Sequence, residues 1–528
     1  MANEHSRSSA SLAQAADAKS GAVADVAPAF GRVRAWIVDH GDLVATVVVG
    51  LVAFAARLYG LGNKPFWYDE VLTLLRANQP FGAVAIDSMK HNHVPTWFWL
   101  EWAILGLGVG EFTLRLPAAI LGAVCASLVQ IIGARVAGRW AGAMAGLLMA
   151  FAPYQVAMGQ EARSYAMVTA LILVALWGLI RLLAESSADD SGRSRTAGWV
   201  AYCAGTIGAL YVLGVAIPWL VGANLAALAA IPAMRQGRLR LAAWWLAAQL
   251  LIVASVAPPF ALLAKYSAEG HGTAFNRVLR FDLPRVETMI DATYLMRTTQ
   301  TTTMEILPVG LPYFGFLVLA LAALGIWRLR TSPRLLSAIL APAVALPVVL
   351  FLSSGGRHNF LLPRYLSWGA APYFILAGAG LAVLPRRAQA AACALIAILA
   401  LVNLVPYYGA ETHARWDLAA ADIAPQLRDG DVMLAAPQGT YARMFETYAA
   451  RLGPVPNLWW ISDPGRAFEF LHNGHRLWVF FGGATVPDTD SVDIFAATLS
   501  RFGKPKAHLV EGARINVWFY DLSPAANH

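Results

Sequence analysis

Charged residues are scarce in this chain. They account for 14% of its 528 residues, whereas hydrophobic residues account for 58%. A soluble domain carries about a quarter charged residues, and the mean hydropathy here is +0.53. The composition therefore predicts a polytopic α-helical membrane protein. The formal charge of +8 does not indicate a nucleic-acid partner, because the arginines lie in short clusters between apolar runs, as in proteins oriented across a membrane.

Cysteine is equally rare, and the sequence lacks several cofactor signatures. Cys125, Cys203 and Cys393 all lie inside apolar runs, so they indicate packing and no disulfide framework. There is no internal repeat and no glycine-rich phosphate loop. His91 and His93, two positions apart on a loop with acids nearby, are weak evidence for a metal site. The sequence therefore indicates no certain cofactor and leaves a divalent metal open.

A cleavable signal is also missing. Residues 1–30 are rich in Ala and Ser and have few large apolar groups, so we expect residues 1–38 to be a disordered cytoplasmic N-terminus. The first apolar run is long enough to span a membrane and is expected to be an uncleaved anchor.

Long apolar runs are what the chain has in abundance. Their lengths predict eleven membrane spans within a membrane domain of residues 39–408. The expected spans are 41–60, 112–134, 140–158, 165–184, 198–214, 216–231, 242–264, 307–327, 335–353, 366–384 and 388–407.

The apolar segment 95–108 is too short to span and carries Glu101 among three tryptophans. If it does not span, the short cytoplasmic loops hold 13 Lys or Arg in 45 residues, and the opposite loops hold 11 in 111. This bias of about threefold in density agrees with the positive-inside rule. If 95–108 did span, every later loop would change sides. We therefore expect a helix at the outer leaflet.

Residues 409–528 have a different pattern, and Pro406 and Gly409 mark the joint. Short apolar strands are expected at 431–437, 476–483 and 514–522, and helices at 416–427 and 440–452. Strands that alternate with helices predict a small α/β domain. The span count places this domain on the outer side of the membrane.

The outer loops hold the candidate chemistry. The pair Asp69-Glu70 follows the first span directly, and carboxylates beside a membrane are costly unless they have a function. They could instead start an interfacial helix, the arginines could snorkel to the interface, and the histidines could be solvated. The outer polar residues, most of them at span ends where they can converge, are Asp69, Glu70, Lys90, His91, His93, Arg115, Glu161, Arg163, Tyr165, Arg357, His358, Arg364 and Tyr365.

Residues 40–410 resemble the GT-C glycosyltransferases of the protein O-mannosyltransferase type, including the bacterial aminoarabinose-transferase-like branch of family 39. After Asp69-Glu70, the resemblance is carried by "HNHVPTWFWLEWAILGLGVGEFTLRLPAAILGAV", "GQEARSYAM" and "LPRYLSWGAAPY". Val94 replaces the first of two prolines that are usual in the bacterial branch. The segment "RWDLAAADI" is similar to one that follows the last span in many bacterial relatives.

The resemblance implies outer juxtamembrane helices between spans one and two and a polyprenyl-phosphate sugar as donor. It places the catalytic base at Asp69, a companion acid at Glu70 and their supporting arginine at Arg115.

From these residues we expect an inverting transfer of a sugar to an acceptor hydroxyl of a glycan, lipid or protein. Arg163 and Arg364 would bind the donor phosphate, because the guanidinium fork matches phosphate oxygens. Further donor-site candidates are Lys90, His93, Glu161, Tyr165 and Tyr365. A flippase for lipid-linked sugars is the alternative, although it would need no acid pair and more charges within its spans. A scaffold would leave the outer cluster unexplained.

Overall fold

The computed structural model describes most of the chain, with gaps. The described residues are 40–184, 192–234, 237–269, 290–300, 306–308, 310–311, 313–354, 360, 362–410, 412–435, 438–466, 469, 476–482, 506–509 and 515–521. The predicted N-terminal region 1–38, and Arg357 and His358, lie outside them.

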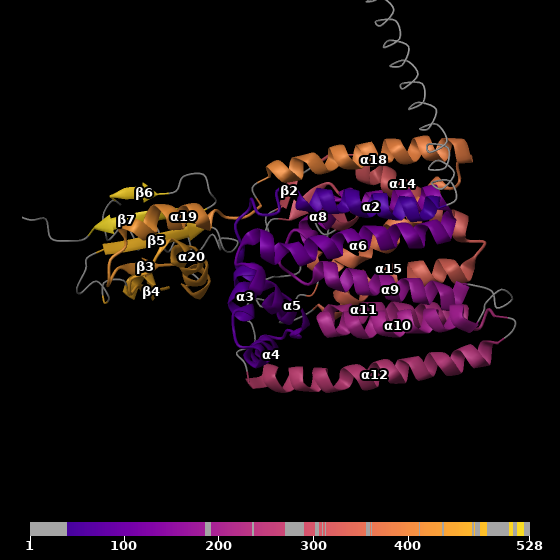
Figure 1. The fold of residues 1–528 in the computed structure, drawn as a ribbon, viewed down its shortest axis with the longest axis horizontal. Helices are drawn as coiled ribbons and strands as arrows, with labels where there is room; N and C mark the ends of the chain where they lie inside the picture. Colours follow the sequence, from indigo (N-terminus) through magenta and orange to yellow (C-terminus); the bar gives the residue numbers. More distant parts are fainter. Residues whose placement is uncertain are drawn as a thin grey trace, which may run out of the picture.

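Long helices form a bundle in which they run side by side (Figure 1). Each of the eleven predicted spans overlaps a helix or, for 140–158, two helices. They are α2 (Gly41–Leu58), α6 (Glu111–Ala137), α7 (Arg139–Phe151), α8 (Pro153–Gly159), α9 (Tyr165–Ala184), α10 (Gly192–Val212), α11 (Ile217–Ala230), α12 (Arg238–Glu269), α14 (Phe314–Leu329), α15 (Pro333–Ser353), α17 (Ala370–Leu381) and α18 (Arg386–Gly409).

Fewer of these helices meet the length and composition of a complete span. Six in the described part of the chain do so, and the bent pair α7–α8 makes seven if it counts as one span. A span of the hydrocarbon core needs about 20 apolar residues, whereas α11, α14 and α17 are shorter. The count of eleven therefore remains a prediction.

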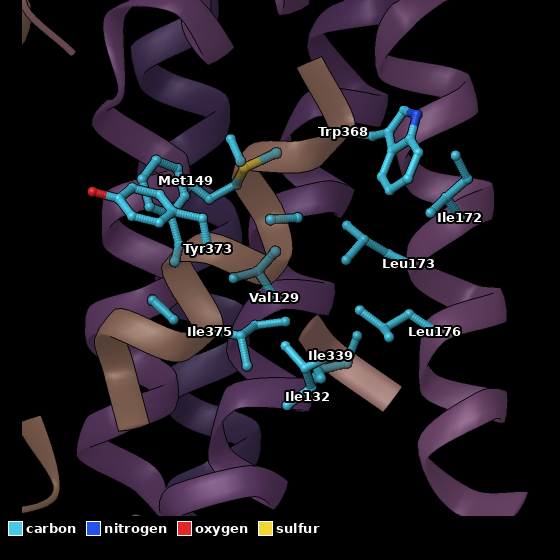
Figure 2. Close-up of a cluster of buried hydrophobic side chains, with 14 of the residues drawn as sticks. Val129, Ile132, Met149, Ile172, Leu173, Leu176, Ile339, Trp368, Tyr373 and Ile375 are labelled. Atoms are coloured by element: carbon cyan, nitrogen blue, oxygen red, sulfur yellow. The ribbon is translucent and has the colours of Figure 1, made fainter. Parts of the chain in front are cut away.

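Small residues let neighbouring helices approach closely. A Cβ on Gly325 of α14 would collide with the backbone of Leu376 on α17, and one on Gly380 would collide with Leu321 in return. Such contacts are typical of helices that pack in a membrane. Large apolar side chains fill the wider spaces, as Figure 2 shows for Ile132 of α6 and Leu176 of α9, which both lie near Ile339 of α15.

A buried arginine stabilises the 64° bend between α7 and α8. Arg57 of α2 donates to the carbonyls of Met149 and Ala150, each at 3.2 Å, and to that of Gln155 at 3.3 Å. The break leaves carbonyls at the end of α7 without helical partners, and Arg57 supplies donors to them.

Three short helices lie across one end of the bundle (Figure 1). They are α3 (Tyr68–Ala77), α4 (Phe81–Lys90) and α5 (Thr96–Ile104), which continues as the turn η1 (Leu105–Leu107). α5, the segment whose topology was uncertain in the sequence, has nine residues, less than half of a span. We call this end of the bundle the site end.

The described part of residues 290–369 adds short elements. A π-helical turn, η4 (Asp291–Leu295), precedes an antiparallel pair of strands, β1 (Thr298–Gln300) and β2 (Ile306–Pro308). Helix α16 (Pro363–Leu366) and the turn η5 (Ser367–Gly369) lead into α17.

Beyond the site end lies a C-terminal unit (Figure 1). Its five-stranded sheet has the order β4-β3-β5-β7-β6, with β3 parallel to β4 and β5, and β7 antiparallel to β5 and β6. The predicted strands correspond to β3, β5 and β7; the three-residue strands β4 and β6 were not anticipated. The elements are α19 (Trp416–Ile423), η6 (Ala424–Gln426), β3 (Val432–Leu434), α20 (Gln438–Leu452), β4 (Trp459–Ile461), η7 (Pro464–Arg466), β5 (Arg476–Gly482), β6 (Ala507–Leu509) and β7 (Ile515–Asp521).

The core of this unit continues into the site end. Trp416, Phe445 and Trp478 belong to one buried apolar cluster with Phe66 and Leu114. That residues 409–528 form an independent periplasmic domain remains a prediction.

Candidate active site

Helix α3 presents its two acids in different directions. Asp69 and Glu70 lie in its first turn, where carboxylates stabilise the unpaired N–H groups of a helix. Consecutive helical residues point about 100° apart, so the two side chains cannot share one environment. The Asp69 side chain is 21% exposed and that of Glu70 is fully buried.

Glu70 forms a buried ion pair with Arg115 of α6. Oε1 accepts from Arg115 Nε at 2.8 Å, and Oε2 accepts from Nη2 at 2.7 Å. The backbone N–H of Ala162 donates to Oε1 and that of Trp67 to Oε2. Each carboxylate oxygen thus accepts two hydrogen bonds, which is the full capacity of the group.

Arg115 is saturated as well. Besides Glu70, it donates to the carbonyls of Leu61 and Lys64 through Nη1 and of Pro65 through Nη2. These contacts use all five N–H donors of the guanidinium. The pair therefore ties α3, α6 and the loop 61–67 together and has no donor left for a ligand.

Asp69 instead meets two arginines from distant parts of the chain. Its Oδ2 lies 3.2 Å from Nη1 of Arg364 on α16 and 3.8 Å from Nη2 of Arg163, which follows α8. Arg163 also contacts the Asp69 carbonyl at 3.4 Å and the Thr73 hydroxyl at 3.3 Å. The structure thus brings Asp69, Arg163 and Arg364 together from three separate segments of the chain.

These two arginines retain donors for a ligand. Nε of Arg163 is buried without a hydrogen-bond partner among the described residues. Arg364 makes one hydrogen bond there, to Asp69, and its guanidinium lies 5.8 Å from the ring centres of Trp67 and Tyr365. Buried polar groups are normally paired, so the unpaired donors favour a site for an anion.

Glu161 and Tyr165 flank this cluster. Burial, together with the negative charge of Glu70, raises the pKa of Glu161 to about 8, so this acid is mostly protonated at neutral pH. Tyr165 begins α9 and hydrogen-bonds to Arg163. Tyr365 packs with Tyr165 in a small apolar cluster. All three predicted donor-site residues therefore lie beside the arginines.

His93 and Lys90 differ in placement. Burial, with the positive charges of Arg163 and Arg76, lowers the pKa of His93 well below its ordinary range, so the ring is neutral near the cluster. Lys90 is exposed at the end of α4, and the structure records no ion pair for it among the described residues. The structure does not bring Lys90 into the cluster.

The structure adds a pocket that was not anticipated from the sequence. It lies beside Arg115 and is lined in part by Lys64, Gln160, Glu161, Tyr407 and His413. Burial and the charge of Arg115 lower the pKa of Lys64 to about 8, and its ammonium lies 4.2 Å from the centre of the Tyr407 ring. Tyr407 and His413 are far from Lys64 in sequence and match no motif that would have identified them.

In the part of the chain that the structure describes, the residues that could ligate a metal do not cluster. Among the described residues, no three His, Cys, Asp or Glu side chains are grouped as a metal ion requires. His91 contacts the carbonyl and carboxylate of Asp87, and His93 packs edge-on against Phe98. No chemical step is therefore assigned to a metal.

No family model and no curated protein sequence matches the chain. Solved structures do. The apo structure of ArnT from Cupriavidus metallidurans superposes with a TM-score of 0.57 at 17% identity, over 91% of this chain and 98% of that one. The structure of that protein bound to undecaprenyl phosphate gives 0.53 at 18% identity, over the same shares.

A third similar structure is the Archaeoglobus fulgidus oligosaccharyltransferase in complex with Zn and sulfate. It superposes with a TM-score of 0.51 at 14% identity, over 82% of this chain and 67% of that one. At these identities the comparison concerns the fold alone. The proteins compared are GT-C superfamily glycosyltransferases, and this chain has the GT-C glycosyltransferase fold.

Proposed function

We propose that the protein is an inverting glycosyltransferase that moves a sugar from a polyprenyl phosphate to an acceptor hydroxyl. The observation that carries the proposal is the placement of Asp69 between Arg163 and Arg364, which retain hydrogen-bond donors. A carboxylate beside two such arginines provides a base and an anion site within a few ångströms, and both are needed for this reaction.

Asp69 is the proposed general base. As the acceptor oxygen bonds to the anomeric carbon, its proton passes to an Asp69 oxygen and the bond from that carbon to the phosphate oxygen breaks. The polyprenyl phosphate leaves with the electron pair. A single displacement of this kind inverts the anomeric centre. A positioned base contributes about 10²–10⁴-fold to the rate.

Arg163 and Arg364 are proposed to bind the phosphate. The Asp69 carboxylate accepts one hydrogen bond from Arg364 and lies 3.8 Å from Nη2 of Arg163, as a phosphate oxygen would. Donor binding would therefore move the arginines from Asp69 to the phosphate and leave Asp69 able to accept the acceptor's proton. Tyr165, Tyr365, Glu161 and His93 surround these groups and would contact the sugar or phosphate.

Glu70 and Arg115 are proposed as positioning residues. Their hydrogen-bonding capacity is used within the protein, so neither can bind the acceptor without breaking the pair. Their role would be to hold the first turn of α3, and with it Asp69, against α6.

The proposed location is the periplasmic face of a bacterial inner membrane, in cell-envelope glycosylation. The positive-inside rule supports this side for the site end, because the arginine-rich loops are those assigned to the cytoplasm. The acceptor hydroxyl could belong to a glycan, a lipid or a protein.

Mass spectrometry of a deletion strain would test the function. We expect a polyprenyl-phosphate sugar to accumulate and one surface glycoconjugate to lose that sugar, and both should be restored by the wild-type gene and not by Asp69→Asn. Full restoration by Asp69→Asn would contradict the proposal and would favour a flippase, which needs no base.

A further inference from the structure

The short segment 64–68, which leads into Asp69 and ends at the first residue of α3, is held from two sides. On one side, Arg115 of α6 donates to the carbonyls of Lys64 and Pro65, and Glu70 of α3 accepts the N–H of Trp67. Phe66 lies between these contacts with no exposed surface. Its backbone N–H must therefore find a partner inside the protein.

That partner comes from the C-terminal unit, almost 400 residues away in sequence. The N–H of Phe66 donates to the hydroxyl of Tyr448 on α20. The Tyr448 hydroxyl donates in turn to Oε1 of Glu111 at 2.7 Å, and Arg451 donates to the same oxygen at 2.8 Å. Hydrogen bonds thus run from the Phe66 N–H through the Tyr448 hydroxyl to Glu111, the first residue of α6.

Other contacts join the same two parts. Nδ1 of His413 lies 2.6 Å from the carbonyl of Pro65, and Arg443 of α20 reaches the Tyr68 hydroxyl at 3.4 Å. The Arg451 guanidinium lies 5.3 Å from the centre of the Phe66 ring. The C-terminal unit thus contacts Pro65, Phe66 and Tyr68, which are three of the four residues that immediately precede Asp69.

We propose that Tyr448 is a positioning residue for the transfer, and that the C-terminal unit sets the placement of Asp69 through the hydrogen bonds from Phe66 to Tyr448 and from Tyr448 to Glu111. This inference rests on the proposed role of Asp69. It gives the C-terminal unit a part in the reaction that does not depend on acceptor recognition.

Helix α6 contacts both the C-terminal unit and the loop before Asp69. Glu111 and Arg115 lie one turn apart on α6 and face the same side; Glu111 fixes α20, and Arg115 fixes the loop. Tyr448 holds the same loop from the C-terminal unit, through the N–H of Phe66, three residues before Asp69. Reacting groups tolerate little displacement, and a misplacement of about 1 Å can cost on the order of 100-fold in rate.

The test replaces the hydroxyl alone. Tyr448→Phe removes the acceptor of the Phe66 N–H and keeps the ring. Tyr441→Phe is the matched control, because Tyr441 lies on the same helix and its ring packs against Trp416 and Phe480 within the C-terminal unit. Both variants are made in the full-length protein and compared at equal membrane expression.

Hydrogen exchange and lipid binding give readouts besides activity. We expect Tyr448→Phe to accelerate amide exchange in a peptide that covers residues 62–74, whereas Tyr441→Phe should not. Binding of undecaprenyl phosphate in nanodiscs should stay within about twofold, because Arg163 and Arg364 are untouched. Sugar transfer in the complemented deletion strain should fall about 10-fold or more.

A double-mutant cycle measures the coupling between Tyr448 and Glu111. If Tyr448 acts through Glu111, Glu111→Ala should cost transfer in the wild type and little more in Tyr448→Phe. Glu111→Gln, which keeps an oxygen for the tyrosine hydroxyl, should recover part of the activity lost in Glu111→Ala.

Unchanged exchange at 62–74 in Tyr448→Phe, or transfer equal to that of Tyr441→Phe, would overturn the inference. If the C-terminal unit only presented an acceptor, the exchange at this loop would be unchanged. If the proposed function is wrong, Asp69→Asn will transfer sugar as wild type does. The hydrogen-exchange experiment would still show whether Tyr448 orders the loop.

Discussion

Asp69 and Glu70 are consecutive residues with separate partners. Oδ2 of Asp69 lies 3.2 Å from Nη1 of Arg364, 295 positions away in sequence, and the Asp69 side chain is 21% exposed. Glu70 is fully buried and bonded to Arg115. Asp69 lies beside arginines that retain N–H donors for a ligand, whereas each oxygen of Glu70 already accepts two hydrogen bonds within the protein. Substitutions of the two acids should therefore have different consequences.

Asp69→Asn should reduce sugar transfer by about 10²–10⁴-fold, because the amide cannot accept the acceptor's proton. Undecaprenyl-phosphate binding should be unchanged or tighter, because a competing carboxylate is removed from Arg163 and Arg364. The measurements are transfer in membranes and lipid binding in nanodiscs. Asp42→Asn is the control, because Asp42 pairs with Arg139 on the surface at the opposite end of α2. Transfer by Asp69→Asn within about threefold of wild type would contradict the assignment of Asp69 as the general base.

Arg163→Lys and Arg364→Lys should each weaken undecaprenyl-phosphate binding, by roughly 10-fold. Lysine keeps the charge but loses the planar fork, and a hydrogen bond to a charged group contributes about 1.5–3 kcal/mol. A titration in nanodiscs measures this, with Arg139→Lys as a surface control. Normal binding by both variants would mean that these arginines only anchor the interface.

Glu70→Gln should lower stability more than it lowers lipid binding. It removes the charge that compensates buried Arg115, and breaking a buried pair costs about 3–5 kcal/mol. Thermal unfolding in detergent should show a clear decrease in the melting temperature. Glu446→Gln is the control, because its exposed hydrogen bond to Trp460 should be worth little. An unchanged melting temperature for Glu70→Gln would show that Arg115 does not depend on this acid.

Glu161 should make stability depend on pH. Its pKa is raised to about 8 in the folded protein, first by burial, so its favourable contribution is complete below the unfolded value and is lost as pH rises towards 8. Glu161→Gln should therefore melt like wild type near pH 5 and at a higher temperature than wild type above pH 8. Melting curves across this range measure the effect, and a difference that does not vary with pH would contradict it.

Topology is the simplest test of the proposed side. A reporter fused after His528 should be periplasmic, and one fused after Gly237 should be cytoplasmic, because the arginine-rich loops stay inside. A cytoplasmic signal after His528 would mean that the span count is wrong by an odd number.

Sequence alone located most of the helices, because long apolar runs with arginines between them have few alternatives in a membrane. It also located the acids and arginines at the ends of these runs. It missed the three-residue strands β4 and β6, because three residues carry too little periodicity to distinguish a strand from a loop.

The residues alone did not separate the roles of Asp69 and Glu70; the family resemblance did, with Asp69 as the base and Glu70 as its companion acid. Their partners lie between 45 and 295 positions away, and no local pattern specifies which distant side chain each will meet. The bend at α7–α8 was likewise hidden within a continuous apolar run, although Arg57, a charge inside a predicted span, could have indicated a buried contact.

The sequence by itself determined that this is a membrane protein whose ionisable residues lie mainly between its apolar runs, because hydropathy and charge act locally and can be counted along the chain. Only the tertiary structure decided that Asp69 meets Arg163 and Arg364, that Glu70 is fully used by Arg115, and that Tyr448 contacts the loop before Asp69. Those contacts depend on how the helices pack and where the C-terminal unit docks, and packing is set by the shapes of distant side chains together.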